Sequence, residues 1–311
     1  MSISLILFLV TLLGVDGGCR LSAAAPTDAT DVAAMQAIAK STGADRSLGW
    51  GVKSADPCDG TWSGVHCDKD LGHVTAISAS RAGLKGTLSG TDLVNLRFLA
   101  ELDLSFNCLG DDLPILPRPL SLLTNLNLQS NCFQIMPKGF FRSFPFLETV
   151  VLDDNKVIMG DITEVPPCPA LRSFSANNVT IWGKPPAYFG NATLFPALER
   201  LSLARNQLWG VVPPSFGKNT NIKFLDISRQ DDDGYTGKFT GRLDFVLGMT
   251  GLVEIHLAGN TFFGPLPNVS GLVNLKVFDA ADNQLCGPVK FPSGVVAVNV
   301  DGNPKIGKSC P

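Results

Sequence analysis

The stretch Leu198–Gly217, LERLSLARNQLWGVVPPSFG, is the feature that most limits how this chain can fold. Leu201 and Leu203 alternate with small polar or apolar residues, as in a short strand with one buried face. Asn206 suits a turn in which its side-chain amide bonds the backbone of neighbouring turns, and Gly210 permits a return bend. A unit this short cannot bury its own apolar face, so it must stack on copies of itself.

Copies of this unit recur about every 24 residues along the chain. The strands are expected at Val74–Ala79, Leu99–Leu104, Leu123–Leu128, Leu147–Leu152, Leu171–Ala176, Leu198–Leu203, Ile222–Ile227, Leu252–Leu257, Leu275–Ala280 and Val295–Val300. The asparagine position is filled by Asn107, Asn131, Asn155, Asn206, Asn260, Asn283 and Asn303. Ala82, Val179 and Gln230 stand in at the other turns.

This pattern resembles the extracellular leucine-rich repeat of plants, LxxLxLxxNxLxGxxPxx. The resemblance implies an α/β solenoid, a right-handed superhelix with a parallel β-sheet on its concave face and a short helical cap at its N-terminus. We expect a signal peptide at 1–25, a cysteine-containing cap at 26–72 and nine repeat turns at 73–294. A terminal half-repeat and a C-terminal tail would follow at 295–311.

The N-terminus predicts a secretory signal peptide. An apolar run from Leu5 to Val15 is followed by small residues at Ser22–Ala25, near which cleavage is expected. The run is too short for a membrane anchor, and no later segment reaches the length of a membrane span. The sequence therefore predicts a secreted, extracellular protein in an oxidising compartment.

Composition excludes one class of partner and leaves a question about the cysteines. The net charge of −3 gives no electrostatic footprint for nucleic acid. Loss of Cys19 with the signal peptide leaves seven of the eight cysteines. An odd number means that at least one thiol stays outside the intramolecular disulfides.

Residues 30–48 predict a short amphipathic helix with Thr30 or Asp31 as its N-cap. The following segment resembles the N-terminal cap of plant leucine-rich-repeat receptors, with its marker residues at Trp50, Cys58, Trp62 and Cys67. Such a cap covers the apolar end of a solenoid. Cys58 and Cys67 enclose a short loop and are expected to form a disulfide, because a redox or metal role would need further ligands nearby.

Two other cysteine pairs are open to bridging. Cys108 and Cys132 each follow the repeated asparagine in adjacent turns, and strands about 4.8 Å apart fall within the Cα separation of a disulfide. Equivalent positions point the same way, however, which is poor geometry for a bridge. Cys286 and Cys310 could staple the C-terminal end, and Cys168 has no evident mate.

Three Asn-x-Ser/Thr sequons begin at Asn178, Asn191 and Asn268. In a secreted protein they are expected glycosylation sites, which would mark surface that partners leave uncovered.

Two tryptophans are candidates for a binding surface on the flank of the solenoid. Trp182 and Trp209 precede the glycines of successive turns. Side by side they would form an aromatic patch of the kind enriched in binding hot spots. The alternative is lateral packing beneath a loop.

Outward strand positions predict a small, polar concave surface of mixed sign, which includes Asp226 and His256. Just beyond the strands, Arg205 and Arg229 fall on consecutive turns and could clasp an anionic group. The alternative for each of these residues is an ordinary solvated side chain.

No catalytic constellation is found. The histidines are His66, His73 and His256, and the chain has neither a GxSxG nor an HExxH motif. The insertion RQDDDGYTGKFT places Gly234 as a calcium loop would, but Thr240 replaces the bidentate glutamate. We therefore expect no catalytic residues, no metal site and no cofactor.

A closer resemblance is carried by longer motifs in their order along the chain. The segments LRSFSANNVTIWGKPP, FPALERLSLARNQLWGVVP and MTGLVEIHLAGNTFFGPLPNVSGL look like the ectodomain of the plant transmembrane kinase (TMK) family. That family consists of plasma-membrane receptor kinases linked to auxin signalling. The chain stops at Cys310-Pro311, where the family's spacer begins. Cys310 resembles the first cysteine of a spacer pair, so its family partner would be missing. The kinase domain of the family is not expected in this chain, so kinase activity is not carried over.

The sequence therefore predicts a secreted or truncated receptor-like recognition protein rather than an enzyme. Its expected partner is a protein or peptide ligand, with a membrane receptor kinase as one candidate, and its location would be the plasma membrane if the chain is a truncated receptor. The alternative is a cell-wall enzyme inhibitor of the polygalacturonase-inhibitor type.

Overall fold

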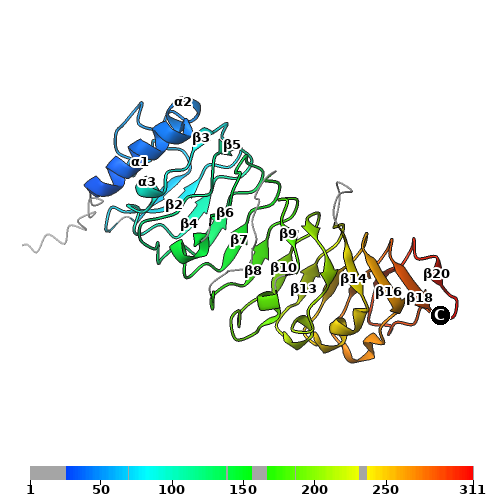
Figure 1. Cartoon of the computed structure of the whole chain (residues 1–311). Coiled ribbons are helices and arrows are strands. Elements are labelled where there is room, and N and C mark those ends of the chain that lie inside the picture. The colour runs from blue at the N-terminus through cyan, green and yellow to red at the C-terminus, as the bar shows by residue number, and fades with distance from the viewer. Residues whose placement is uncertain are drawn as a thin grey trace, which may run out of the picture.

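The computed structural model describes residues 26–68, 70–137, 139–155, 167–185, 187–230 and 237–310. The predicted signal peptide with Cys19, and residues 231–236 of the insertion, lie outside the described residues. Figure 1 shows an elongated, curved solenoid with the helical cap at one end and the C-terminus at the other.

One continuous sheet runs the length of the solenoid. Its strands in spatial order are β1 (Val65–Cys67), β2 (Val74–Ser78), β4 (Glu101–Asp103), β6 (Asn125–Asn127), β7 (Thr149–Val151), β8 (Ser173–Ser175), β10 (Arg200–Ser202), β13 (Phe224–Asp226), β15 (Glu254–His256), β17 (Val277–Asp279) and β19 (Ala297–Asn299). All pairings are parallel except that of β1 with β2. Each of the ten segments predicted to be strands contains one, so the predicted architecture is confirmed.

In the strands of this sheet from β2 to β17, one residue per strand points into the core and stacks on its equivalent in the next turn, whereas Val298 of β19 is 37% exposed. Leu201 pairs in register with Phe174 on one side and Leu225 on the other, and all three are buried. A strand period of two residues forces the flanking residues to the opposite face. The sheet therefore has one apolar face inside and one face on the concave surface.

The repeated asparagine forms a buried ladder that joins adjacent turns. The side-chain amide of Asn206 donates to the carbonyl oxygens of Leu203 at 2.9 Å and of Ala176, in the preceding turn, at 2.8 Å. Its Oδ1 accepts the backbone N–H groups of Val179 and Ile181 at 3.2 and 3.1 Å. These bonds satisfy backbone groups that the sharp turn would otherwise leave unpaired. The predicted role of the asparagine is confirmed.

Gln230 takes the asparagine role in the next turn. Its Nε2 donates to the carbonyl oxygens of Leu203 at 3.0 Å and Ile227 at 3.2 Å, and its Oε1 accepts the N–H of Leu208 at 3.1 Å. The longer side chain thus reproduces both halves of the asparagine's bonding.

Aromatic packing is concentrated where the ladder residue is replaced by Val179. The phenylalanines of this region are almost fully buried and lie in successive ring contacts of 5.2–5.8 Å: Phe140, Phe141, Phe144, Phe174, Phe189 and Phe195. Burial of aromatic side chains is a large stabilising contribution. Apolar packing therefore stabilises the centre of the solenoid where the polar ladder is interrupted.

A second set of short strands forms the flank of the solenoid after several of the ladder positions. They are β3 (Lys85–Thr87) with β5 (Cys108–Gly110), β9 (Trp182–Gly183) with β11 (Gln207–Leu208), and the sheet β12 (Gly210–Val211), β14 (Phe239–Gly241), β16 (Thr261–Pro265), β18 (Gln284–Gly287) and β20 (Lys305–Ile306). Gly210 has a φ of 95°, and the φ of Gly86, Gly183, Gly241, Gly264 and Gly287 in other flank strands is also positive. This conformation requires glycine and sets the direction of the return bend.

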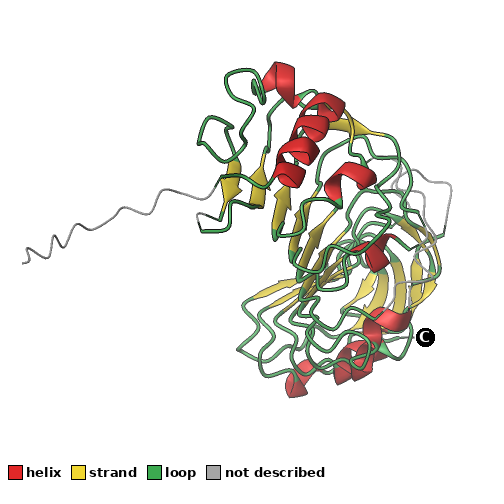
Figure 2. Ribbon diagram, turned by 90° about the vertical axis from the view of Figure 1, so that its left-hand side faces the viewer, coloured by secondary structure: helices red, strands yellow, loops and turns green. Residues whose placement is uncertain are grey.

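Short helices lie in the return segments. They are α3 (Gly90–Leu93), η1 (Phe140–Ser143), η2 (Ala187–Gly190), η3 (Phe216–Lys218), η4 (Leu243–Gly248) and η5 (Val269–Gly271). Figure 2 shows the strands side by side along the solenoid, with the longest helix in the cap and short helices among the return segments. No helix within the described ranges is long and apolar enough to cross a membrane.

The cap differs from its prediction at the start of its helix. Helix α1 spans Ala29–Thr42 and is followed by α2, Ala44–Ser47. The N-cap is Asp28, whose side chain accepts from Thr30 N–H, so the predicted N-cap at Thr30 or Asp31 is wrong. Asp31 is instead buried and accepts the N–H of Val74 at 2.8 Å. The Asp31 side chain points inward, where this hydrogen bond joins helix α1 to strand β2.

Two tryptophans and a disulfide hold the rest of the cap. The rings of Trp50 and Trp62 are buried and stack with centroids 5.6 Å apart. Cys58 and Cys67 form the predicted disulfide, with Cα atoms 5.7 Å apart. Gly64 is needed because a Cβ there would lie 2.0 Å from the carbonyl oxygen of Ser78. The cap thus covers the first turn through close packing.

Cys286 and Cys310 form the second disulfide, with Cα atoms 5.3 Å apart. The bridge joins β18 to the C-terminal tail. The implication of the family resemblance that Cys310 awaits a spacer cysteine is therefore wrong for this fold. Cys108 and Cys132 have their sulfur atoms 3.6 Å apart and are not joined by a disulfide, because equivalent side chains point the same way.

We expect the Cys168 thiol to be unreactive toward alkylating reagents in the folded protein. It is 1% exposed, and burial raises the pKa of its thiol to about 11. Only about one molecule in a thousand would carry the reactive thiolate at pH 8. Iodoacetamide at that pH should label exposed Cys108 but should label Cys168 only after unfolding in guanidinium, as measured by peptide mass spectrometry. Equal labelling of both cysteines in the native protein would contradict this placement.

Candidate functional site

Part of the concave surface is a closed network of polar side chains. The Ser175 hydroxyl donates to both carboxylate oxygens of Asp153 at 2.8 and 2.9 Å, and the Ser202 hydroxyl donates to Asn177 Oδ1 at 2.9 Å. Ser175 and Ser202 are buried although they point outward from the sheet. These side chains form their hydrogen bonds within the protein. They therefore stabilise the sheet and offer few free donors or acceptors to a partner.

The N-terminal outward positions of β10 and β13, together with His256 of β15, present a different and more accessible arrangement on the same face. The guanidinium carbon of Arg200, on β10, lies 3.5 Å from the ring centroid of Phe224, on β13. The Phe224 ring lies 5.5 Å from the ring of His256, on β15. Arg200 and Phe224 face each other because they pair in register, whereas His256 pairs with Asp226 and lies diagonally across from Phe224. A guanidinium group over an aromatic ring is a favourable cation–π contact. We refer to Arg200, Phe224 and His256 as the concave stack.

Carboxylates surround the histidine end of the concave stack. His256 Nε2 lies 3.7 Å from Glu254, and its Nδ1 lies 3.9 Å from Asp279. One carboxylate oxygen of Asp226 is already occupied, because its Oδ1 accepts from the N–H and hydroxyl of Ser228 at 3.0 and 2.7 Å. The stack therefore has a cationic end at Arg200 and an acidic surround at His256. A partner with both signs of charge fits such a surface.

Arg205 and Arg229 stand at the rim of the concave face, as their spacing predicts. Each lies one residue before a ladder residue, with φ of 55° and 54°, and each is exposed. The next turn has Gly259 there, where a Cβ would come within 3.1 Å of Arg229 Cγ. None of the ion pairs found in the described ranges involves either arginine. Two guanidinium groups are thus available to an anionic group.

The tryptophans lie on the flank but are not equivalent in register. Trp182 pairs with Gln207, and the backbone N–H of Trp209 donates to the carbonyl oxygen of Gly183. Trp209 therefore lies two residues beyond the position that pairs with Trp182. They are 54% and 41% exposed, and Lys184 lies 5.8 Å from the Trp209 ring centroid. The expected aromatic surface is therefore exposed, but its two rings do not stack as equivalent residues of adjacent turns.

All three sequons are accessible. Asn178 occupies the rim position one turn before Arg205, with a φ of 53°, and its amide donates to Asp154 at 2.9 Å. Asn191 follows η2 and Asn268 precedes η5, so both lie on the helical side of the solenoid. Glycosylation at these residues stays a prediction, and two of the three glycans would stand away from the concave stack.

One group of metal-type side chains occurs in the described part of the chain: Asp28, Asp31 and His73. Asp31 already accepts from Val74 and lies 3.3 Å from His73 Nδ1. Burial raises the pKa of Asp31, whereas hydrogen bonding to Thr30 lowers the pKa of Asp28. Since these bonds join the cap to the first strand, the cluster is explained by its structural role.

Arg200 and Phe224 are the surface residues that sequence reasoning missed. The predicted concave set began one outward position later, at residues such as Asp226 and His256. In a strand, every second residue points to the same face, so the residues two positions before Ser202 and Asp226 also point outward. These residues are Arg200 and Phe224. Their adjacency could then be read from the common register of the repeats.

Comparison with known proteins supports the repeat assignment. A leucine rich repeat N-terminal domain model matches residues 28–68, and a leucine rich repeat model matches residues 197–219. Receptor-like kinase TMK2 of Arabidopsis thaliana is 33% identical over 242 residues, which is 76% of this chain and 26% of the relative. The chain thus spans about a quarter of the length of that relative.

Two solved structures show the same fold. The ectodomain of the Arabidopsis thaliana receptor kinase GASSHO1/SCHENGEN3, in complex with CASPARIAN STRIP INTEGRITY FACTOR 2, matches with a TM-score of 0.69 and 20% identity over 83% of this chain and 30% of that one. A plant ice-binding protein matches with a TM-score of 0.68 and 21% identity over 92% of this chain and 99% of that one. Identity this low supports the fold alone, because one fold hosts many functions.

Proposed function

We propose that this chain, a leucine-rich-repeat ectodomain similar to those of the TMK receptor kinases, recognises a protein or peptide partner at the cell surface. Recognition occurs on the concave face and rim of the turns that carry β10, β13 and β15. The chain acts by binding and performs no catalysis itself, and its location is extracellular.

The concave stack is the observation that carries this proposal. On β8 and at the C-terminal end of β10, outward side chains such as Ser175 and Ser202 are buried and bonded within the protein. Arg200, Phe224 and His256 instead combine an aromatic ring with ionisable groups on an accessible surface. Aromatic and arginine side chains are the residues that most often dominate the energy of binding.

The rim extends this surface toward the flank. Arg205 stands between Arg200 and Trp209 in the same turn, and Arg229 follows Phe224 in the next. The partner that fits has an extended acidic segment crossing the rim and an apolar side chain seated on the stack. The GASSHO1/SCHENGEN3 complex supports a ligand-binding role for this fold, while the residues that bind are specific to each chain.

Affinity capture tests this proposal. Residues 26–311, secreted from plant cells with an affinity tag, would be incubated with detergent-solubilised plasma membrane and with extracellular fluid. We expect mass spectrometry to identify an extracellular peptide or a receptor-type membrane protein that is enriched by the wild-type chain. The Arg205→Glu, Arg229→Glu double variant should lose at least about tenfold of that enrichment, because repulsion replaces two charge-assisted contacts.

The matched control is Arg97→Glu with Lys276→Glu, which reverses two exposed charges away from the concave stack. It should retain the partner. Capture of pectin-degrading enzymes without any receptor or peptide would contradict the proposal in favour of the enzyme-inhibitor alternative. Equal losses with both double variants would show that the contact is non-specific.

A further inference from the structure

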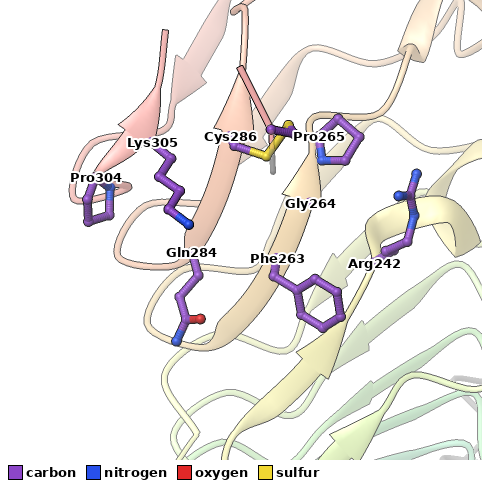
Figure 3. A pocket seen from close by; sticks show the side chains of 9 residues that line it. Arg242, Phe263, Gly264, Pro265, Gln284, Cys286, Pro304 and Lys305 are labelled. Carbon is purple, nitrogen blue, oxygen red and sulfur yellow. A yellow bond between two sulfur atoms is a disulfide. The ribbon is translucent and has the colours of Figure 1, made fainter. Parts of the chain in front are cut away.

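The flank of the last turns contains a cavity that is separate from the concave stack. Its volume is about 580 Å³, within the range of small-molecule sites. Figure 3 shows Lys305 and Gln284 on one side, Arg242 on the other and Phe263 between them, with the Cys286 disulfide and Pro265 behind. No residue of the concave stack lines it.

Glycine and the disulfide explain why the flank is hollow here. Gly264, on β16, has a φ of 83° and leaves open the space where a Cβ would lie 3.5 Å from Arg242 Cγ. The Cys286–Cys310 bridge brings the C-terminal tail against β18 and closes one wall. The cavity is therefore held by a covalent link and by the paired strands β16 and β18.

The charged groups of the cavity are cationic. No ion pair in the described ranges involves Lys305. Arg242 donates through Nε to Asp244 at 2.8 Å, which fixes its guanidinium group and leaves its terminal nitrogens for another acceptor. Asp244 lies outside this lining and lines a neighbouring cavity of about 560 Å³ that shares Arg242 and Phe263. Asp244 offsets one of the two positive charges, and Lys305 stays uncompensated.

The remaining lining combines the exposed amide of Gln284 with exposed apolar surface. Phe263 is 47% exposed, although it is a large apolar side chain, and it stands beside Pro265 and the disulfide. Exposed aromatic surface next to an uncompensated cation is complementary to a molecule with a carboxylate and a hydrocarbon body.

We infer that this cavity binds a small organic anion. Its carboxylate contacts the Lys305 ammonium, and its apolar body packs against Phe263, which lies between Lys305 and Arg242. This site is additional to the proposed recognition of a protein or peptide, since the two surfaces share no residue.

Saturation-transfer NMR with 4-phenylbutyrate, an aromatic carboxylate, tests the inference on the intact secreted chain. We expect saturable binding with a Kd on the order of 1 mM. The uncharged 4-phenylbutyramide should bind about tenfold more weakly, because it cannot form the charge-assisted contact with Lys305. Lys305→Met should weaken binding of the acid by about tenfold, and Phe263→Ser by about fivefold.

The matched controls are Lys290→Met and Val273→Ser, which remove an exposed cation and an exposed apolar side chain outside the cavity. Both should bind the acid within twofold of the wild type. All four positions are exposed, so the variants should keep the circular-dichroism spectrum and unfolding midpoint of the wild type. Absence of saturable binding, equal affinity for acid and amide, or equal weakening by Lys290→Met and Lys305→Met would each overturn the inference.

Discussion

Replacing Asn206 with alanine is expected to lower the free energy of unfolding by about 4 kcal/mol. Asn206 is 1% exposed, and its side chain satisfies carbonyl oxygens of Leu203 and Ala176 and N–H groups of Val179 and Ile181. Water cannot reach these groups in the folded chain, so the alanine variant leaves them buried without partners. Urea unfolding followed by tryptophan fluorescence would measure the loss.

The control for Asn206→Ala is Asn125→Ala, which removes an exposed amide from strand β6. We expect that control to change stability by less than about 0.5 kcal/mol. If the two variants unfold at the same urea concentration, the buried ladder does not stabilise the solenoid as described. Gln230→Ala should resemble Asn206→Ala, because Gln230 makes the same set of contacts one turn later.

Phe174→Ala is the second substitution with a large expected effect, about 3–5 kcal/mol. Phe174 is 1% exposed and lies in the aromatic cluster, 5.8 Å from the Phe141 ring and 5.2 Å from the Phe189 ring. Its turn has Val179 in place of the ladder asparagine, so loss of the ring leaves a cavity in a turn with weaker polar connections. A solenoid turn contacts only its neighbours. The two halves should therefore unfold separately in this variant.

Hydrogen exchange followed by mass spectrometry would detect that separation. Amides of β7, β8 and β10 should exchange faster in Phe174→Ala than in the wild type, while those of β2 in the cap-proximal turn should change little. The matched control is Phe146→Ala, since Phe146 is 51% exposed and makes no ring contact in the aromatic cluster. Uniform acceleration along the chain would show that the solenoid unfolds as one unit despite its repeat construction.

The backbone of this molecule is readable from sequence because each repeat obeys the same local constraints. Leucines with a period of two, a turn amide and a flank glycine specify strand, corner and bend in most turns. The prediction failed at the cap because Asp28, Thr30 and Asp31 are all plausible N-caps. The choice depended on a contact with Val74, far along the chain, which no local pattern reveals.

The candidate site was less predictable than the fold for a related reason. Outward strand positions look alike in sequence. Ser202 is nevertheless buried in a hydrogen-bonded network, while Phe224 is only partly buried and its ring contacts Arg200. That difference depends on which side chains stand beside each residue in adjacent turns. The register offset of Trp182 and Trp209 has the same origin, because the strand pairing places Gln207 opposite Trp182.

If the concave stack recognises a partner, a single substitution in the stack must weaken binding of that partner. The affinity of the captured partner for single variants measures this. Surface plasmon resonance would compare the wild type with Arg200→Glu and with Arg97→Glu, two exposed arginines of which only Arg200 belongs to the stack. We expect Arg200→Glu to raise the Kd by at least about tenfold and Arg97→Glu to leave it within twofold. An unchanged Kd for Arg200→Glu would show that the concave stack does not bind the partner.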